Sequence, residues 1–249
     1  MRKPVMAANW KMYKTAAETA VFFEKFLPLV AGSGHCEVLI CPPYLSVGAA
    51  VDAARGTRVQ IGAQNLHSKK EGAFTGEISA PMIRAADCTH VLVGHSERRQ
   101  LFGETDQGVS DKAVAALDAG LTPVICVGER VEQRQSGETD AVLAAQFQKG
   151  IGPLSEEQFS RILIAYEPVW AIGTGLVATP EQAADAHRAI RAQALARYGT
   201  DAAAGIRILY GGSVKPDNVK GLMAQPEIDG ALVGGASLDP FSFASIVNF

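Results

Sequence analysis

The sequence predicts an α/β fold in which eight parallel strands close into a (β/α)8 barrel, with helices outside and residues 1–249 forming a single domain. Short apolar runs occur eight times, and they are continuous, as in parallel strands that are covered on both faces. Segments of helical character separate these runs, and no linker or change of composition divides the chain. Eight such repeats in 249 residues fit a closed barrel well.

The expected strands are residues 5–10, 38–41, 59–63, 90–93, 123–127, 162–166, 206–210 and 231–233. An open, doubly wound sheet is the alternative to the barrel. A nucleotide-binding sheet of that kind places Gly-x-Gly-x-x-Gly after its first strand, whereas the first run here ends in Asn9-Trp10-Lys11. The open sheet is therefore disfavoured.

Capping signals and apolar spacing predict the helices between the strands. Thr179 and Gln182 form a capping box with Pro180 at the first helical position, and Ser155 opens a second capping box. Residues 15–30 carry apolar side chains on one side, and residues 111–119 also read as a helix. The pattern is least regular over residues 64–79, a long polar segment that presents Phe74 near its tip. A loop of that length in a compact domain is usually functional or disordered, and the aromatic side chain indicates a partner surface.

Composition excludes several classes of protein. The net charge is −3, and no Lys/Arg cluster indicates nucleic acid. No signal peptide is recognisable, and no apolar run is long enough to span a membrane. The four cysteines are scattered, as expected for reduced, packed thiols in a cytoplasmic protein. The histidines show no ligand spacing, so we expect no metal site.

Chemically active residues are concentrated where the expected strands end. Glu167 closes the sixth run, and Pro168 and a Gly-Thr-Gly segment follow it, an arrangement that suits a fixed base beside a mobile loop. The ends of barrel strands meet at one face, so polar residues there converge. The set is Asn9 and Lys11, then His95 and Glu97, then Glu167, then Ser213 after Gly211-Gly212, and finally Gly234 and Gly235. Gly-rich turns at the last two strand ends suit a phosphate, so the set fits a small phosphorylated carbonyl compound that undergoes proton transfer.

Each of these residues also has a structural reading when taken alone. His95 could be a satisfied core histidine, and Lys11 could extend to solvent. Glu97 and Arg98 could form a local ion pair, and for Glu97 a structural and a catalytic role stay equally open.

The sequence resembles the triosephosphate isomerase family through motifs that appear in the family's order and spacing over essentially the whole chain. The motifs are Asn9-Trp10-Lys11-Met12, Gly94-His95-Ser96-Glu97-Arg98-Arg99, Ala165-Tyr166-Glu167-Pro168-Val169-Trp170 and Tyr210-Gly211-Gly212-Ser213, with Gly234-Gly235 after them. The resemblance implies a TIM barrel that interconverts dihydroxyacetone phosphate and D-glyceraldehyde 3-phosphate through an enediolate, in glycolysis and gluconeogenesis. It also implies that no metal or organic cofactor takes part.

The resemblance assigns a role to each strand-end residue. Glu167 would be the base, His95 a neutral imidazole that polarises the carbonyl oxygen, and Lys11 a positive charge against the enediolate and phosphate. Asn9 would hydrogen-bond the substrate oxygens, and Glu97 belongs to the site. Backbone N–H groups of the phosphate site would come from Gly173, Ser213, Gly234 and Gly235.

The resemblance also implies a lid that closes over the site, formed by Pro168, Val169, Trp170, Ala171, Ile172, Thr174, Gly175, Leu176, Val177 and Ala178. Trp170 would hydrogen-bond Glu129 in one state of this lid. The chain departs from the family at Leu176 and Val177, where Lys and Thr are usual, and at Tyr13, where Asn is usual. We expect activity to survive the change of hinge, because the hinge carries no chemical group.

Residues 64–79 resemble the family's interdigitating dimer loop, which implies a homodimer and leaves a tetramer open. Phe74 would lie at the interface, and Thr75 would reach into the partner's site to support Asn9 and Glu97. Glu77 would pair with Arg98 across the interface.

Two other functions remain as alternatives. A barrel enzyme acting on a larger sugar phosphate usually needs different strand-end groups, and the small lid argues against it. A catalytically idle barrel would have lost Glu167, His95 or Lys11, and all three are present.

Overall fold

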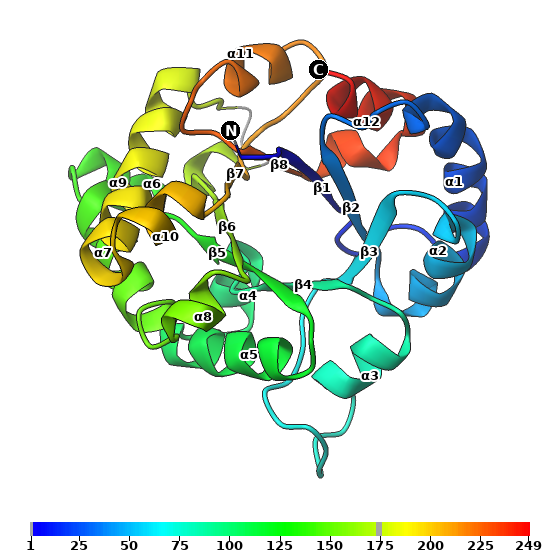
Figure 1. The fold of residues 1–249 in the computed structure, drawn as a ribbon, viewed down its shortest axis with the longest axis horizontal. Coiled ribbons are helices and arrows are strands. Elements are labelled where there is room, and N and C mark those ends of the chain that lie inside the picture. Colours follow the sequence, from blue (N-terminus) through cyan, green and yellow to red (C-terminus); the bar gives the residue numbers. More distant parts are fainter. Residues whose placement is uncertain (1, 173–175) are drawn as a thin grey trace.

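Eight parallel strands close into a barrel in which each strand pairs with the next along the chain, and β8 pairs with β1. The computed structural model describes residues 2–172 and 176–249. Figure 1 shows the strands around the centre and the helices in a ring outside them. The (β/α)8 barrel predicted from the sequence is therefore confirmed.

The strands lie close to the predicted positions. They are β1 (Val5–Asn9), β2 (Glu37–Cys41), β3 (Val59–Ala63), β4 (His90–Val93), β5 (Thr122–Val127), β6 (Leu163–Tyr166), β7 (Ile208–Tyr210) and β8 (Gly230–Val233). The largest difference is at β7, which begins two residues later than expected because the Ile206 N–H still bonds to Ala202 O at the end of the preceding helix.

The described α-helices are α1 (Ala16–Val30), α2 (Val47–Ala54), α3 (Ala80–Ala85), α4 (Ser96–Leu101), α5 (Asp106–Asp118), α6 (Val131–Gln135), α7 (Thr139–Gly150), α8 (Glu156–Phe159), α9 (Pro180–Tyr198), α10 (Thr200–Gly205), α11 (Val219–Met223) and α12 (Pro240–Val247). Short 3-10 turns cover Tyr44–Ser46, Val169–Ala171 and Gly235–Leu238. Both predicted capping boxes are present, at Thr179 and at Ser155. Helix α5 begins before the predicted residue 111, because the Thr105 side chain caps it by accepting the Gly108 N–H.

The core has two layers, which explains why the strand sequences are continuously apolar. Alternate residues such as Val5 and Ala7 fill the barrel interior, and Met6 and Ala8 pack outward against the helices. All four cysteines are buried and unpaired within these layers. Among the described residues, no helix is both long and apolar enough to cross a membrane.

Residues 64–79 form a loop that projects away from the barrel between β3 and α3, as Figure 1 shows. Its base is joined by a bridge between His67 and Ser79, and the His67 ring packs 4.0 Å from the Phe74 ring. Phe74, Thr75 and Glu77 are exposed on it.

Candidate active site

A cleft of about 280 Å³ opens at the carboxyl ends of the barrel strands. Its lining comes from the ends of β1, β4, β6, β7 and β8, so residues from one end of the sequence to the other meet there. Of the residues predicted from the sequence, it brings together Asn9, Lys11, His95, Glu167, Ala171, Ile172, Ser213, Gly234 and Gly235.

Glu167 follows β6 directly and is only 2% exposed. Its Oε1 lies 2.9 Å from His95 Nε2, and its Oε2 accepts the Ser96 N–H at 2.8 Å. Burial alone raises the pKa of a carboxyl group, but the His95 ring and the Ser96 N–H lower the pKa of Glu167 by more. The carboxylate is therefore held in its charged form although it is buried.

His95 lies at the start of helix α4, where its Nδ1 accepts the Glu97 N–H at 3.2 Å. An accepting Nδ1 carries no proton, so the neutral ring has its proton on Nε2 and donates it toward Glu167. Burial lowers the pKa of His95, and the Glu167 carboxylate raises it by more. That upward shift depends on Glu167 staying in contact with the ring.

Lys11 adopts a left-handed backbone conformation with φ of 51°. Asn9 Oδ1 accepts the Lys11 N–H at 3.0 Å, and the Gln64 amide donates to Lys11 O at 2.8 Å. These contacts hold a conformation that a lysine rarely adopts. The ammonium group pairs with Glu97, so that carboxylate holds the cation in the cleft.

The side of the cleft that the sequence predicts to bind phosphate is formed by the turns after β7 and β8. Gly211 and Gly212 also line it, and a Cβ at Gly212 would lie 2.2 Å from the Tyr210 hydroxyl oxygen, so a larger residue there would require the buried Tyr210 ring to shift. Lys215 joins the lining as a cation that the sequence analysis did not single out. Gly173, predicted for this subsite, lies outside the described residues.

The first hinge of the lid is predicted at Pro168-Val169-Trp170, and in the structure Pro168 precedes the 3-10 turn Val169–Ala171. Trp170 Nε1 donates to Glu129 Oε1 at 2.8 Å, which confirms that predicted contact, and the Tyr166 hydroxyl donates to the same oxygen at 3.0 Å. Leu176 and Val177 are exposed, and Ala178 is buried. Thr174 and Gly175 lie outside the described residues.

The residues predicted for a dimer loop lie outside this cleft. Phe74, Thr75 and Glu77 are on the projecting loop, and Arg98 Nε lies 3.5 Å from Glu104 Oε2. Sequence reasoning missed the roles of Ser96, Gln64 and Lys215. The motif around His95 pointed toward Ser96, but nothing in the sequence indicated that Gln64 holds Lys11.

A parallel barrel with a buried carboxylate, an imidazole and an ammonium group around one cleft defines a (β/α)8-barrel enzyme of the proton-transfer class. A sequence model described as "Triosephosphate isomerase" matches residues 4–249. The chain belongs to the triosephosphate isomerase family.

Curated relatives and a solved structure agree with this assignment. A triosephosphate isomerase of Solibacter usitatus is 66% identical over 249 residues, covering 100% of both chains. One of Symbiobacterium thermophilum is 53% identical, covering 99% of this chain and 96% of its own. The crystal structure of triosephosphate isomerase from Bartonella henselae matches with a TM-score of 0.89 at 39% identity, covering 99% of this chain and 98% of its own.

Proposed function

We propose that the chain interconverts dihydroxyacetone phosphate and D-glyceraldehyde 3-phosphate, the activity of its family, and so serves glycolysis and gluconeogenesis. The observation that carries the proposal is the carboxylate of Glu167, buried at the inner end of the cleft against His95 and Ser96. A water-poor site strengthens a carboxylate that must remove a proton from carbon.

Glu167 removes a proton from C1 of dihydroxyacetone phosphate, and the electrons of that bond form the enediolate. The same carboxyl group returns the proton to C2, which gives the aldehyde with no net gain or loss of atoms. Both Glu167 oxygens are engaged in the described site, so the substrate must displace at least one of those contacts before proton removal.

His95 and Lys11 stabilise the charge that develops on the substrate oxygens. The Nε2–H of His95, freed from Glu167, donates to the carbonyl oxygen and moves a proton between the two oxygens. Lys11, held by Glu97, supplies positive charge, and Asn9 donates a hydrogen bond. These steps change no oxidation state overall and use only protons, so we propose no metal or organic cofactor.

Backbone N–H groups of Ser213, Gly234 and Gly235, together with Gly173, bind the phosphate. The described part of this subsite supports the assignment, because the turn Gly235–Leu238 begins there and Ser213 lines the same wall. The lid from Pro168 to Ala178 closes over the substrate and excludes water, with Ile172 already at the cleft.

Glu167→Gln tests the function directly. The amide cannot accept the proton, so we expect the turnover of glyceraldehyde 3-phosphate in a coupled assay to fall by about 10³-fold or more. Phosphoglycolate, a mimic of the enediolate, serves as a control for intact binding. Turnover close to native in this variant would disprove the proposed base.

We propose that two copies of the chain form a homodimer around the loop of residues 64–79. Exposed apolar side chains lie on two segments beside the base of this loop: Met12 is 93% exposed and Leu45 96%. These segments adjoin the loop, because Gln64 bonds to Lys11 O and the Tyr44 hydroxyl bonds to Asn65 O. A patch of this kind on a loop favours burial against a second copy, with Thr75 reaching the partner's site and Glu77 pairing with the partner's Arg98.

Phe74→Glu tests the dimer. A charge at the tip of the loop disfavours burial, so we expect sedimentation equilibrium to show a monomer where the native chain is a dimer. Turnover should fall about tenfold or more as Thr75 leaves the partner's site. Phe241→Glu, at an exposed position on α12, is the control and should leave both the oligomeric state and the turnover unchanged. If the Phe74→Glu variant still forms a dimer like the native chain, this interface is wrong.

We further infer that residues 1–249 are one domain and that the protein acts in the cytoplasm. The continuous barrel supports the first inference, and a single calorimetric unfolding transition is expected. Four buried, unpaired thiols support the second, which cell fractionation tests.

A further inference from the structure

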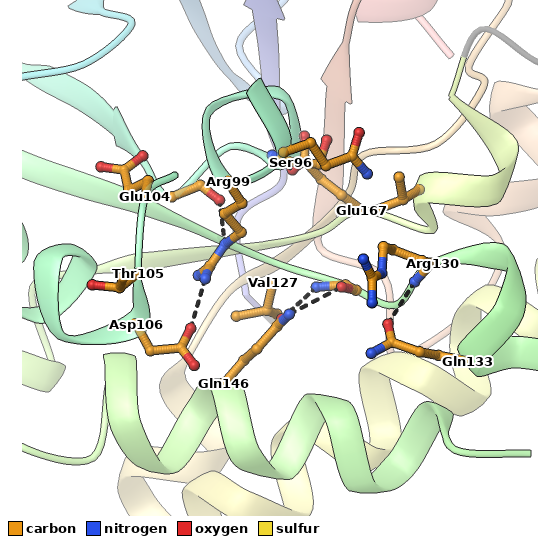
Figure 2. Close-up of a pocket in the computed structure, with 14 residues that line it drawn as sticks. Ser96, Arg99, Glu104, Thr105, Asp106, Val127, Arg130, Gln133, Gln146 and Glu167 are labelled. Atoms are coloured by element: carbon orange, nitrogen blue, oxygen red, sulfur yellow. Dashed lines mark hydrogen bonds and ion pairs between the residues drawn. The ribbon is translucent and has the colours of Figure 1, made fainter. Parts of the chain in front are cut away.

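A second cavity, of about 490 Å³, lies behind Glu167 on the side away from the phosphate subsite. Glu167 lines both spaces and so forms part of the wall between them. Figure 2 shows the second cavity, with Arg99 and Asp106 on one side, Arg130 and Gln133 on the other, and Gln146 reaching in from below.

Gln146 comes from the middle of helix α7, and its amide makes two hydrogen bonds to one residue. Its Oε1 accepts the Gly128 N–H at 2.7 Å, and its Nε2 donates to Gly128 O at 3.1 Å. Figure 2 shows both as dashed lines. Strand β5 ends at Val127, so the side chain satisfies the backbone where the strand ladder stops.

Gly128 matters because it packs directly against the backbone of Glu167. A Cβ at position 128 would lie 1.7 Å from Glu167 O and 2.6 Å from its carbonyl carbon, so the two backbones touch. The preceding residue accepts the Glu167 N–H through Val127 O at 2.8 Å. The position of Gly128 therefore fixes the position of the Glu167 backbone.

The residue after Gly128 supports the first hinge of the lid. Glu129 O accepts the Val169 N–H at 3.1 Å, and the Glu129 carboxylate holds the Trp170 indole. Gly128 and Glu129 together form the backbone support on which the base and the start of the lid rest.

We propose that Gln146 is a positioning residue for the isomerase reaction, acting through the Gly128–Glu129 backbone on Glu167. This rests on the proposed role of Glu167 as the base. Gln146 is not itself catalytic, since it contacts the Gly128 backbone and not the cleft that binds substrate. An amide is the side chain that fits, because it offers one donor and one acceptor in the same plane.

Gln146→Leu removes both hydrogen bonds at similar volume. We expect kcat to fall by about 10- to 100-fold, as for a small displacement of a catalytic group, and KM to stay within about threefold. KM is spared because the phosphate subsite is built from the turns after β7 and β8, across the barrel. Gln148→Leu, on the exposed side of the same helix, is the matched control and should behave as the native chain.

Gln146→Glu separates a positioning role from a merely structural one. The ionised carboxylate accepts the Gly128 N–H but repels Gly128 O, whereas the protonated acid restores both bonds. The kcat of this variant relative to the native chain should therefore rise as pH falls, which Gln146→Leu should not show. The charged groups around the introduced carboxyl are Arg99 on α4, Glu104 and Asp106 at the start of α5, Arg130 before α6, and Glu167.

The indole N–H signals of the two tryptophans give a readout that does not depend on turnover. Trp170 donates to Glu129, and Trp10 donates to Ser237 O on another side of the barrel. In ¹⁵N spectra of the whole protein, Gln146→Leu and Gln146→Glu at neutral pH should shift the Trp170 signal and leave the Trp10 signal in place.

These experiments distinguish failure of the proposed positioning role from failure of the proposed isomerase function. A native chain that does not turn over glyceraldehyde 3-phosphate would overturn the function, and an active Glu167→Gln variant would overturn the proposed base. An inactive Glu167→Gln variant together with native-like Gln146 variants would overturn only the positioning role. The positioning role would also be overturned if the kcat of Gln146→Leu fell only in proportion to the fraction of protein that is unfolded. If Gln146→Leu fails to fold, the nearly isosteric Gln146→Glu decides by its pH profile.

Discussion

At the scale of single residues, Glu167 meets two opposing requirements. It must stay ionised although its side chain is buried, and its contacts with His95 and the Ser96 N–H keep its pKa low. The same contacts oppose its proposed role as the base, because a carboxylate with a lowered pKa holds a proton less well. We infer that substrate binding, which separates Glu167 from these partners, restores its basicity at the moment when it is used.

His90 gives a prediction of pH-dependent stability. Burial, reinforced by Arg207, lowers the pKa of this histidine from 6.5 to about 4. The unfolded chain therefore takes up a proton on this ring below about pH 6.5, whereas the folded chain stays neutral there to about pH 4. The contribution of His90 is present in full above pH 6.5 and is lost as pH falls toward 4, by about 3 kcal/mol in the free energy of unfolding.

Urea unfolding of the native chain and of His90→Gln between pH 4 and 7 checks this. The difference between the two curves isolates His90 from the carboxylates, which also titrate in that range. If the free energy of unfolding varied with pH in the same way for both proteins, His90 would accept a proton as readily in the folded state as in the unfolded state.

At the scale of elements, the site depends on backbone groups offered by short or ending elements. Helix α4 is only Ser96–Leu101, yet its first N–H binds Glu167 and its cap is His95. The end of β5 supports Glu167, and the turn after β8 lines the proposed phosphate subsite. Each case uses polar backbone groups that have no partner inside their own element.

The second hinge of the lid gives a prediction at this scale. Leu176 and Val177 are exposed, so an apolar pair faces solvent at the predicted second hinge. The double variant Leu176→Lys, Val177→Thr should keep kcat within a few fold, because the hinge holds no chemical group, but should change the rate of lid opening. Relaxation dispersion on the Trp170 indole measures that rate, and identical rates in both proteins would contradict the prediction.

At the scale of the whole molecule, the barrel closes by joining the two ends of the chain. Val5 pairs with Gly230, and a Cβ at Gly230 would lie 1.9 Å from Val5 O, so glycine is needed there. Asp229 ties this seam together, because it accepts from Arg2, from Arg191 at 2.9 Å and from the Ile208 N–H at 2.9 Å. Closure of the barrel therefore depends on contacts between residues near opposite ends of the chain, which no single strand–helix repeat contains.

Asp229→Ala should destabilise the whole barrel. It removes a buried carboxylate and leaves Arg191 and the Ile208 N–H short of a partner, which costs about 3–5 kcal/mol. Asp185→Ala breaks an exposed pair with Arg188 and should cost less than about 0.5 kcal/mol. Denaturant unfolding compares the two, and equal effects would show that the seam does not limit stability.

Sequence patterns were enough to predict the order and extent of nearly all the strands, the capped helices and the residues at the strand ends. These features are local: continuous apolar runs reflect strands buried on both faces, and Thr179 or Ser155 caps its helix within one turn. Because parallel strands in a barrel end at one face, local patterns were enough to predict that Glu167, His95 and Lys11 meet.

The contacts that hold these residues in place could not be predicted and became visible in the folded chain. Gln64 fixes the left-handed Lys11, Ser96 binds Glu167 through its backbone, and Gln146 supports Gly128 from an outer helix. Each contact joins a side chain to the backbone of a distant segment. Such a bond leaves no periodicity or motif in the sequence, because its geometry exists only once the barrel has closed and the helices have packed around it.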